Sequence, residues 1–397
     1  MAAPIRMIRF SKKFNISQDL GHSLLPFHCI NRSPCQQVSR RFFAKDVFKS
    51  VIAGKSLKQV AFASFALGLG VGGTTLFVGH NWNRLKVSAD TKAAQEVKIS
   101  KSIRVNSDDS GLKLTLYQFQ TCPFCCKTRA FLDYYGFSYD VVEVNSVTKK
   151  QIKWSNYKKV PIVVVDDAGE GGPIQLNESS VIISLLESYL TNPSFKIDQL
   201  KSFYPCIESK EGRKTVYDFP NRYFIMFGEK EPKTTPDARK SERTWRFWAD
   251  DHLVHMLSPN VYRTPSEALA TFRYFSEVGE WEKNFSTLER LTVIYVGASV
   301  MYLIGKLLKR KYRLKDDVRE SLYDSCNEWV AAVGKKRKFM GGENPDLSDL
   351  VVYGVLSSIE GCSAFQDALI HTKIGPWYYR TKTAVQTNQG AALRHNK

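Results

Sequence analysis

Three cysteines stand within five residues in the segment 115–136, TLYQFQTCPFCCKTRAFLDYYG. The first two, Cys122 and Cys125, form a Cys-x-x-Cys pair that follows an apolar run and precedes a run with helical spacing. Thiols at this spacing can bind a metal, cycle as a disulfide or hold a thiol cofactor. A zinc site needs a second pair of Cys or His ligands, and the later cysteines of the chain are solitary. The pattern therefore favours thiol chemistry without a metal, and Cys126 stands outside it.

The position of the pair predicts which thiol is reactive. Cys122 falls where an extended run turns into a helix, so unpaired backbone N–H groups and the positive end of the helix dipole favour its thiolate. Pro123 suits the first helical turn, where no N–H is needed. Cys125 lies one turn further along and is expected to be more buried, while Lys127 and Arg129 add positive potential. We predict Cys122 as the low-pKa thiol and Cys125 as its partner.

The surrounding segment alternates between strand and helix patterns. Leu112, Leu114 and Leu116 fall on one face of a strand, the following helix is expected to end at Gly136, and β-branched runs predict two more strands. A short strand and an amphipathic helix complete the segment. The expected elements are strands at 112–119, 137–144, 160–167 and 171–176, with helices at 125–135 and 177–190. This order predicts an α/β thioredoxin-like (glutaredoxin-like) domain over residues 111–195.

Two further positions in this domain could contact a thiol peptide. Val160 and Pro161 open a strand, which is where a proline is tolerated because it cannot donate to a central ladder. Glu178 and Ser179 open the second helix, and the N–H groups there could hold a carboxylate. An ordinary helix N-cap explains the same two residues equally well.

The C-terminal part is predicted to be helical. Residues 196–240 read as a long connection with room for a hairpin, residues 241–385 as an all-α domain, and residues 386–397 as a disordered tail. The uncharged run 291–305 is shorter than a membrane span, so we expect a buried core helix there. Asp346 and Asp349 have the spacing of a capping box.

The N-terminal part is predicted to carry targeting and membrane signals. Residues 1–50 contain nine Lys or Arg, two Asp and no Glu, a composition typical of a transit peptide. Residues 60–79 are uncharged and long enough for one membrane span. We therefore expect a leader over 1–58, a transmembrane helix over 59–80 and a tether over 81–110. A mitochondrial membrane is the favoured location, and a Golgi signal anchor is the alternative.

The composition of the whole chain limits the classes of partner and the cellular compartment that we expect for it. With 397 residues and 43% hydrophobic residues it can bury a sizeable core. The net charge of +18 comes from scattered lysines and arginines, without the basic-aromatic array of nucleic-acid modules. Eight irregularly spaced cysteines do not form a disulfide framework, which indicates a reducing compartment.

Several segments together resemble the family of type 2 membrane-associated prostaglandin E synthases. These are TCPFCCKTRAFLDYYG, VPIVVV, LNESSVII, WADDHLVHMLSPNVYRT, EWVAAVGKKRKFMGG and NPDLSDLVVYGVL. The resemblance implies a thioredoxin-like domain joined to a glutathione-transferase-like helical domain, usually as a homodimer. It implies an isomerase that converts prostaglandin H2 to prostaglandin E2, binds glutathione and can hold haem through the glutathione thiol.

The resemblance also implies roles for individual residues. Cys122 would be the essential thiol and Cys125 its partner, and Pro161 would follow a cis peptide bond. The glutathione site would be lined by Phe124, Val160, Pro161, Glu178 and Ser179.

Two positions depart from the family pattern. Phe119 replaces a frequent tyrosine whose hydroxyl can touch the thiol, and Glu178 replaces an aspartate. Two other functions stay open beside the isomerase. One is a glutathione- or haem-binding membrane protein with little isomerase activity, and the other is a glutaredoxin-like oxidoreductase that uses both cysteines.

Overall fold

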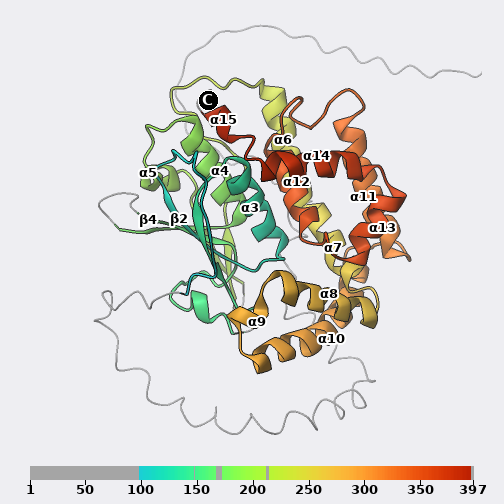
Figure 1. Ribbon diagram of the computed structural model, residues 1–397. Coiled ribbons are helices and arrows are strands. Elements are labelled where there is room, and N and C mark those ends of the chain that lie inside the picture. The colour runs from blue at the N-terminus through green and yellow to red at the C-terminus, as the bar shows by residue number, and fades with distance from the viewer. Residues whose placement is uncertain (1–97, 147, 167–171, 212–213, 395–397) are drawn as a thin grey trace, which may run out of the picture. The chain divides into compact units, whose positions relative to one another are not determined.

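The computed structural model describes residues 98–394, apart from 147, 167–171 and 212–213. The predicted leader (1–58), the predicted membrane helix (59–80) and most of the predicted tether lie outside the described residues. The described chain consists of an α/β part followed by a mostly helical part (Figure 1).

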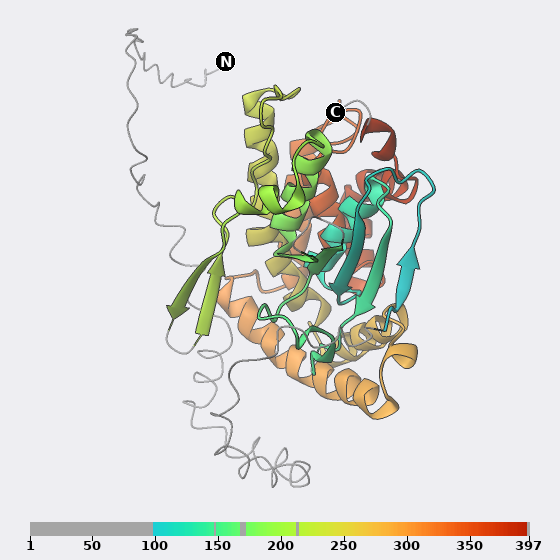
Figure 2. The same ribbon diagram turned by 90° about the vertical axis from the view of Figure 1, so that its left-hand side faces the viewer.

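A five-stranded sheet forms the α/β part, in the order β1-β3-β2-β4-β5. Its strands are β1 (Lys101–Ile103), β2 (Lys113–Gln118), β3 (Tyr139–Glu143), β4 (Ile162–Asp166) and β5 (Ile174–Asn177). Only β2 and β3 pair in parallel; the other pairs are antiparallel. Helix α3 (Pro123–Tyr134) makes the crossover from β2 to β3, and α4 (Ser179–Thr191) follows β5. The predicted glutaredoxin-like arrangement is confirmed, and Figure 2 shows the sheet from another side.

Strand β1 lies inside the segment that we expected to be a tether. It pairs with β3, with Ser102 opposite Asp140, and the Ser102 hydroxyl donates to the Asp140 carboxylate over 2.5 Å. Three residues of mixed polarity give no periodic signal, so this edge strand exists only because β3 offers it a partner. The sheet therefore begins earlier in the chain than the sequence pattern indicated.

The connection after the sheet is more structured than expected. It contains α5 (Ile197–Ser202) and the predicted hairpin, formed by β6 (Ile207–Glu211) and β7 (Lys214–Asp218). The helical part then begins at Pro236, behind the N-cap Thr235. Its elements are α6 (Pro236–Trp248), a π-helical turn η3 (Ala249–Leu253), α7 (Val254–Val261), α8 (Pro265–Val278), α9 (Trp281–Asn284), α10 (Thr287–Lys311), α11 (Val318–Val333), α12 (Leu347–Ser357), α13 (Ser363–His371), α14 (Ile374–Gln386) and α15 (Ala391–Arg394).

Helix α12 carries much of the contact between the two parts. The capping box of Asp346 and Asp349 is present at its start, as predicted. Further along, Gly354 faces α3 so closely that a Cβ there would lie 2.3 Å from the Cα of Lys127. The two helices can approach in this way only because position 354 has no side chain.

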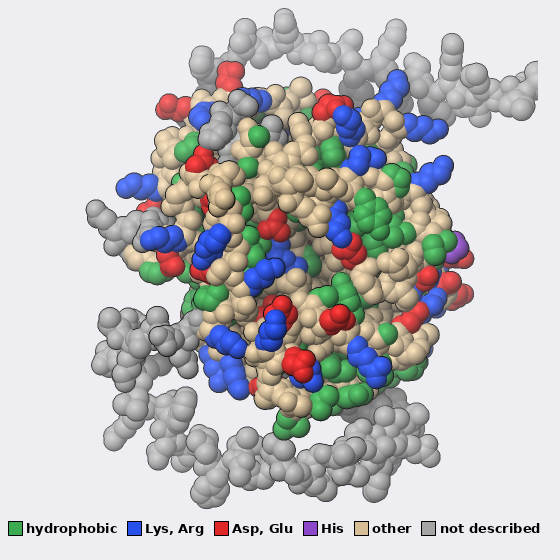
Figure 3. Space-filling view, viewed as in Figure 1, with side chains coloured by type: hydrophobic (Ala, Val, Ile, Leu, Met, Phe, Trp, Pro, Cys, Tyr) green, Lys and Arg blue, Asp and Glu red, His purple; other side chains and the backbone are tan. Residues whose placement is uncertain are grey.

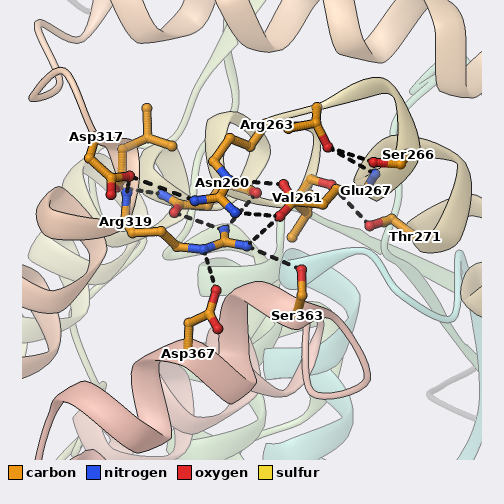
Figure 4. A network of polar contacts seen from close by, with 12 residues as sticks. Asn260, Val261, Arg263, Ser266, Glu267, Thr271, Asp317, Arg319, Ser363 and Asp367 are labelled. Atoms are coloured by element: carbon orange, nitrogen blue, oxygen red, sulfur yellow. Dashed lines mark hydrogen bonds and ion pairs between the residues drawn. The ribbon is translucent and has the colours of Figure 1, made fainter.

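A buried arginine ties the helical part together around α8 (Figure 4). Arg319 of α11 donates to the carbonyl oxygen of Asn260 over 2.7 Å and to the Asp367 carboxylate over 2.8 Å. It also donates to Glu267 of α8 over 3.2 Å. One guanidinium thus joins α7, α8, α11 and α13, and it fixes α8, on which α10 packs.

Two expectations for this part are wrong. The helix around 291–305 is not a buried core helix, because α10 buries one face and exposes large apolar side chains on the other. The uncharged run of fifteen residues was too short to span a membrane, but it lies within a longer helix of 25 residues that extends to Lys311. The tail expected over 386–397 is ordered as far as Arg394: the N–H of Gly390 donates to the carbonyl oxygen of Tyr134 over 2.9 Å. That bond satisfies a carbonyl at the end of α3 that has no partner within its own helix.

Candidate active site

Cys122 is the N-cap residue of α3, in extended conformation directly after β2. Its backbone N–H donates to the carbonyl oxygen of Phe119 over 3.0 Å, and its carbonyl oxygen accepts the first helical bond from Cys126. Pro123 occupies the first helical turn, as the sequence predicted. Cys122 is partly exposed, so its sulfur can meet a reactant from outside.

The two thiols of the Cys-x-x-Cys pair are electrostatically unequal. The pKa of the Cys122 thiol is lowered, chiefly because the Cys125 thiol donates a hydrogen bond to it. The backbone N–H groups of Cys125 and Phe124 and the charge of Arg129 lower it further, against the effect of burial. Cys125 is fully buried, and this burial raises its pKa well above the ordinary value. The pair therefore presents one thiolate, at Cys122, and one protonated donor, at Cys125.

Cys126 has a structural environment of its own. Its thiol donates to the carbonyl oxygen of Gln120 over 3.3 Å and lies 3.2 Å from a nitrogen of the Arg129 guanidinium. Burial raises the pKa of Cys126. Cys126 is not part of the reactive pair, as expected, and its sulfur helps to hold Arg129, whose charge lowers the pKa of Cys122.

A buried carboxyl supports the loop that leads into Cys122. Glu143 at the end of β3 accepts a hydrogen bond from the backbone N–H of Gln120 over 2.7 Å, and one from the Gln118 side chain over 3.3 Å. Burial raises the pKa of Glu143 to about 7, although these hydrogen bonds and Arg129 oppose the shift. Sequence reasoning did not identify this carboxyl, because Glu143 lies in a segment with an ordinary strand pattern.

Lys127 does not serve the thiols, contrary to our prediction. Its side chain is fully buried, and its ammonium group lies 2.5 Å from the Asp250 carboxylate and 2.8 Å from the Ser180 hydroxyl. Asp250 also accepts from Ser180 over 2.7 Å and from Tyr223 over 2.9 Å. Burial would raise the pKa of Asp250, but these partners, Lys127 foremost, bring it below its usual value. Of the two cations expected to favour the thiolate, Arg129 alone lowers the pKa of Cys122.

The peptide bond between Val160 and Pro161 is cis, as the family resemblance implied. Pro161 is buried directly before β4, and Val160 is partly buried. Burial raises the pKa of Tyr157, and the charge of Glu178 and the thiols of Cys206, Cys125 and Cys122 raise it further. Tyr157 is therefore within electrostatic range of the predicted site residues, and sequence reasoning did not single it out although it lies four residues before Pro161.

Glu178 has an unusual backbone, with φ of 70° and ψ of 121°. Its carboxylate accepts from the N–H groups of Ser180 and Val181 over 3.1 and 3.0 Å, so it caps α4. Ser179 is buried, and its hydroxyl lies 3.4 Å from the same carboxylate. A non-glycine residue at positive φ is strained, and such strain often accompanies a functional position. Capping and ligand binding therefore remain compatible at this helix start.

Arg222 is a second residue that sequence reasoning missed. Burial would lower the pKa of its guanidinium, but Tyr223, Glu178 and Asp250 raise it. The guanidinium of Arg222, in the connection, is therefore within electrostatic range of Glu178, one of the predicted glutathione residues. The connection shows no periodicity, so only the folded chain brings Arg222 there.

The chain is similar to known proteins over both parts. Residues 114–169, which include both thiols and Pro161, match the Glutaredoxin family. The chain is 49% identical over 282 residues to prostaglandin E synthase 2 of Danio rerio, covering 70% of this chain and 72% of that protein. It is 47% identical over 298 residues to prostaglandin E synthase 2 of Mus musculus, covering 74% and 76%.

The chain belongs to the prostaglandin E synthase 2 family.

This membership confirms the family resemblance drawn from the sequence motifs. A solved glutathione S-transferase from Rhodospirillum rubrum F11 is also similar, with a TM-score of 0.40 and 14% identity. That match covers 69% of this chain and 91% of the transferase. A similarity of this size supports no conclusion about ligand or activity, so the case for a glutathione site depends on the residues described above.

Proposed function

We propose that the chain is a prostaglandin E synthase, an isomerase that converts prostaglandin H2 to prostaglandin E2 with Cys122 as the reacting thiol. The observation that carries this proposal is the unequal thiol pair at the start of α3, in a chain of the prostaglandin E synthase 2 family. A lowered pKa raises the fraction of Cys122 that is a thiolate, and a thiolate is the nucleophilic form of cysteine.

The reaction needs a nucleophile that can leave again. The Cys122 thiolate attacks one oxygen of the endoperoxide, which forms an S–O bond, breaks the weak O–O bond and releases the other oxygen as an alkoxide. The alkoxide takes a proton and becomes the hydroxyl group. Water then takes the hydrogen on the carbon that carries the sulfur-bound oxygen as a proton, which offsets the proton that the alkoxide took up. The C–H electron pair forms the ketone, and the S–O bond breaks with its electrons returning to sulfur as the thiolate. No atom is gained or lost overall, so the step is an isomerisation.

Cys125 has a supporting role in this mechanism. Its buried thiol stays protonated and donates to Cys122, which stabilises the thiolate both before attack and on release. A disulfide between the two sulfurs would remove the nucleophile, so the isomerisation does not require the pair to cycle.

Glutathione is proposed as the cofactor, held by Phe124, Val160, Pro161, Glu178 and Ser179. The residues present fit a peptide with a free amine and carboxylates. Glu178 supplies a carboxylate for the amine, while Ser179 and Arg222 supply a hydroxyl and a cation for a carboxylate. When bound, glutathione supplies a second thiol beside Cys122.

In the proposed function, haem would be bound only through the thiol of glutathione. His252 lies 2.9 Å from the Ser325 hydroxyl, and His255 stacks on Tyr312 with ring centroids 4.1 Å apart. We therefore assign neither His252 nor His255 to the haem iron as a ligand. A glutathione- and haem-binding protein with little isomerase activity is the corresponding alternative.

Membrane attachment, location and assembly are proposed from the sequence and the family resemblance. Residues 60–79 would anchor the protein in a mitochondrial membrane, with the Golgi as the alternative, and the chain would form a homodimer. Fusing residues 1–90 to a fluorescent reporter tests the location. Golgi staining would reject the mitochondrial assignment, and a diffuse cytosolic reporter would reject the anchor as well.

The decisive experiment is product analysis with purified full-length chain in detergent. Wild type, Cys122→Ser and Cys125→Ser would each be given prostaglandin H2, with and without glutathione and with and without haem. We expect prostaglandin E2 above the uncatalysed background with wild type, none with Cys122→Ser and a measurable part with Cys125→Ser. If Cys125→Ser is as inactive as Cys122→Ser, a glutaredoxin-like dithiol cycle becomes the better account.

Glutathione binding can be tested separately by calorimetry. Glu178→Ala is expected to bind glutathione more weakly than wild type, whereas Glu208→Ala, in β6, should bind as wild type does. Equal affinity of wild type and Glu178→Ala would mean that Glu178 acts only as the N-cap of α4.

A further inference from the structure

Helix α10 has one packed face and one exposed apolar face. Its packed side is formed by Val293, Ile294, Ala298 and Gly305, and Gly297 sits against the ring of Phe272. The exposed side carries a continuous line of large apolar residues, Leu288, Leu291, Tyr295, Val296, Val300 and Leu303. Leu288, Leu291 and Tyr295 form one row at spacings of three and four residues, and Val296, Val300 and Leu303 form a second, adjacent row at the same spacings, so the six side chains share one broad side of the helix.

This exposed line, called the α10 stripe below, is too extended to be ordinary surface. Leu288 is 76% exposed, and Val296 and Leu303 are each 57% exposed. Single apolar residues on a surface need no explanation, but a contiguous patch marks an interaction site. Figure 3 shows apolar side chains gathered along the edge of the molecule where α10 runs.

Most charges next to the stripe are basic. Lys306 and Arg310 continue it beyond Leu303 at the same helical spacing, and both are exposed. Glu289, two turns before Val296 on the same side of the helix, pairs with Lys150 of the sheet part over 3.1 Å. The stripe thus combines apolar side chains with cations, and the carboxylate on its side of α10 is already paired with a lysine. This combination suits an anionic lipid surface better than a second copy of the same stripe.

The length and packing of α10 indicate whether this helix would cross a membrane or lie on its surface. Among the described residues, α10 is the helix long and apolar enough to cross a membrane. However, its packed face is held on α7 and α8, and its 25 residues belong to the folded unit. A helix fixed in this way can present only its free face to lipid, so it would lie along the surface over about 37 Å.

The described part of the chain begins beside this helix. Lys98, the first described residue, donates to the carbonyl oxygen of Lys283 in α9 over 2.8 Å, and α10 begins four residues after Lys283. The eighteen residues 80–97 can reach at most about 65 Å. A membrane anchor at 60–79 would therefore hold the α9–α10 corner within that distance of the bilayer.

We propose that the α10 stripe, with Lys306 and Arg310, is a second membrane contact that lies in the headgroup region of an anionic lipid surface. Leu288, Leu291, Val296, Val300 and Leu303 enter the boundary between headgroups and acyl chains. The two cations remain at phosphate level, because long basic side chains can extend toward the headgroups. The contact sets the orientation of the folded part on the membrane, which a single tethered span leaves open.

Photo-crosslinking of the full-length chain in vesicles tests this contact. A p-benzoylphenylalanine replaces Val296 in one variant, Leu303 in a second and Ile370 in a control. Ile370 in α13 is an equally apolar side chain, 74% exposed, on another helix. The vesicles contain phosphatidylcholine with or without phosphatidylserine, and adducts are identified by mass spectrometry after irradiation.

We expect acyl-chain adducts at 296 and 303 in several-fold higher yield than at 370. The yield should fall when phosphatidylserine is omitted, and also when Lys306 and Arg310 are both replaced by Glu. Lipid adducts no more frequent at 296 and 303 than at 370 would overturn the proposal. Adducts mainly to a second copy of the chain would overturn it too, and would assign the stripe to a subunit interface. Because the anchor is present in every variant, the comparison isolates α10.

Discussion

Replacing Gly354 with alanine tests whether the close approach of α12 and α3 holds the reactive thiol in place. A Cβ at position 354 would lie 2.3 Å from the Cα and 2.6 Å from the backbone nitrogen of Lys127. An ordinary contact needs about 3.4 Å or more, so one of the two helices must move by about 1 Å. Backbone atoms cannot rotate away as a side chain does. We therefore expect a cost near the upper end of the usual overpacking range, about 3 kcal/mol.

The same substitution also brings a gain, because alanine is a better helix former than glycine by up to about 1 kcal/mol. The net loss of unfolding free energy for Gly354→Ala should be about 2 kcal/mol. Gly305→Ala, in the middle of α10, is the matched control, since its nearest neighbours lie 3.4 Å away on Tyr262. That variant should be neutral or up to about 1 kcal/mol more stable than wild type.

Urea unfolding followed by tryptophan fluorescence would compare the three proteins. Because Lys127 lies in the same helix as Cys122, Gly354→Ala should also shift the pH midpoint for alkylation of that thiol. A Gly354→Ala protein as stable as the Gly305→Ala protein would refute the reasoning. It would mean that the two parts are free to separate at α12 without loss.

Three further results are expected. Asp250→Asn should lower the free energy of unfolding by about 3–5 kcal/mol, because it leaves the buried ammonium group of Lys127 without its counter-charge. Glu343→Gln breaks an exposed ion pair and should change the free energy of unfolding little. Equal effects of the two substitutions in urea unfolding would contradict this. Glu143 has a folded pKa of about 7 against an ordinary value of 4.5, so its contribution to stability is full below about pH 4.5 and is lost as the pH rises through about 7. Glu143→Gln should remove a loss of up to about 3 kcal/mol between pH 5 and pH 8, measured as unfolding free energy at each pH, and an unchanged pH profile would show that the carboxyl is not the cause. Cys125→Ala should move the pH midpoint for alkylation of Cys122 to higher pH, and Cys125→Ser, which keeps a hydrogen-bond donor, should move it less. A midpoint unaffected by both substitutions would show that the hydrogen bond from Cys125 is not the main cause of the lowered pKa.

The reactive pair could be predicted from the sequence because its determinants are local. A strand pattern that turns into a helix, a proline in the first turn and a cysteine at the N-cap lie within a few residues of one another. The same holds for the capping box of Asp346 and Asp349, whose bonds join residues three apart. The thioredoxin-like arrangement followed from the alternation of strand and helix patterns along the chain, and the segments that resemble the family are likewise contiguous.

The surroundings of the pair could not be predicted in this way. Lys127 was expected to support the thiolate, but it pairs with Asp250, 123 residues further along the chain. Tyr157 and Arg222 come to the site from segments without periodicity. Strand β1 and the contact of Gly390 with Tyr134 likewise depend on partners that are distant in sequence.

Helix α10 shows most clearly what a local sequence pattern cannot predict. Its apolar residues are visible in the sequence, yet which of them are covered depends on α7 and α8, and those are placed by the buried Arg319. The sequence by itself determined the helices and strands that have a periodic pattern of their own and which thiol stands at a helix start, because backbone conformation and capping depend largely on near neighbours. Tertiary structure alone decided which charges neutralise one another and which apolar face stays open, because burial and ion pairing depend on residues that only folding brings together.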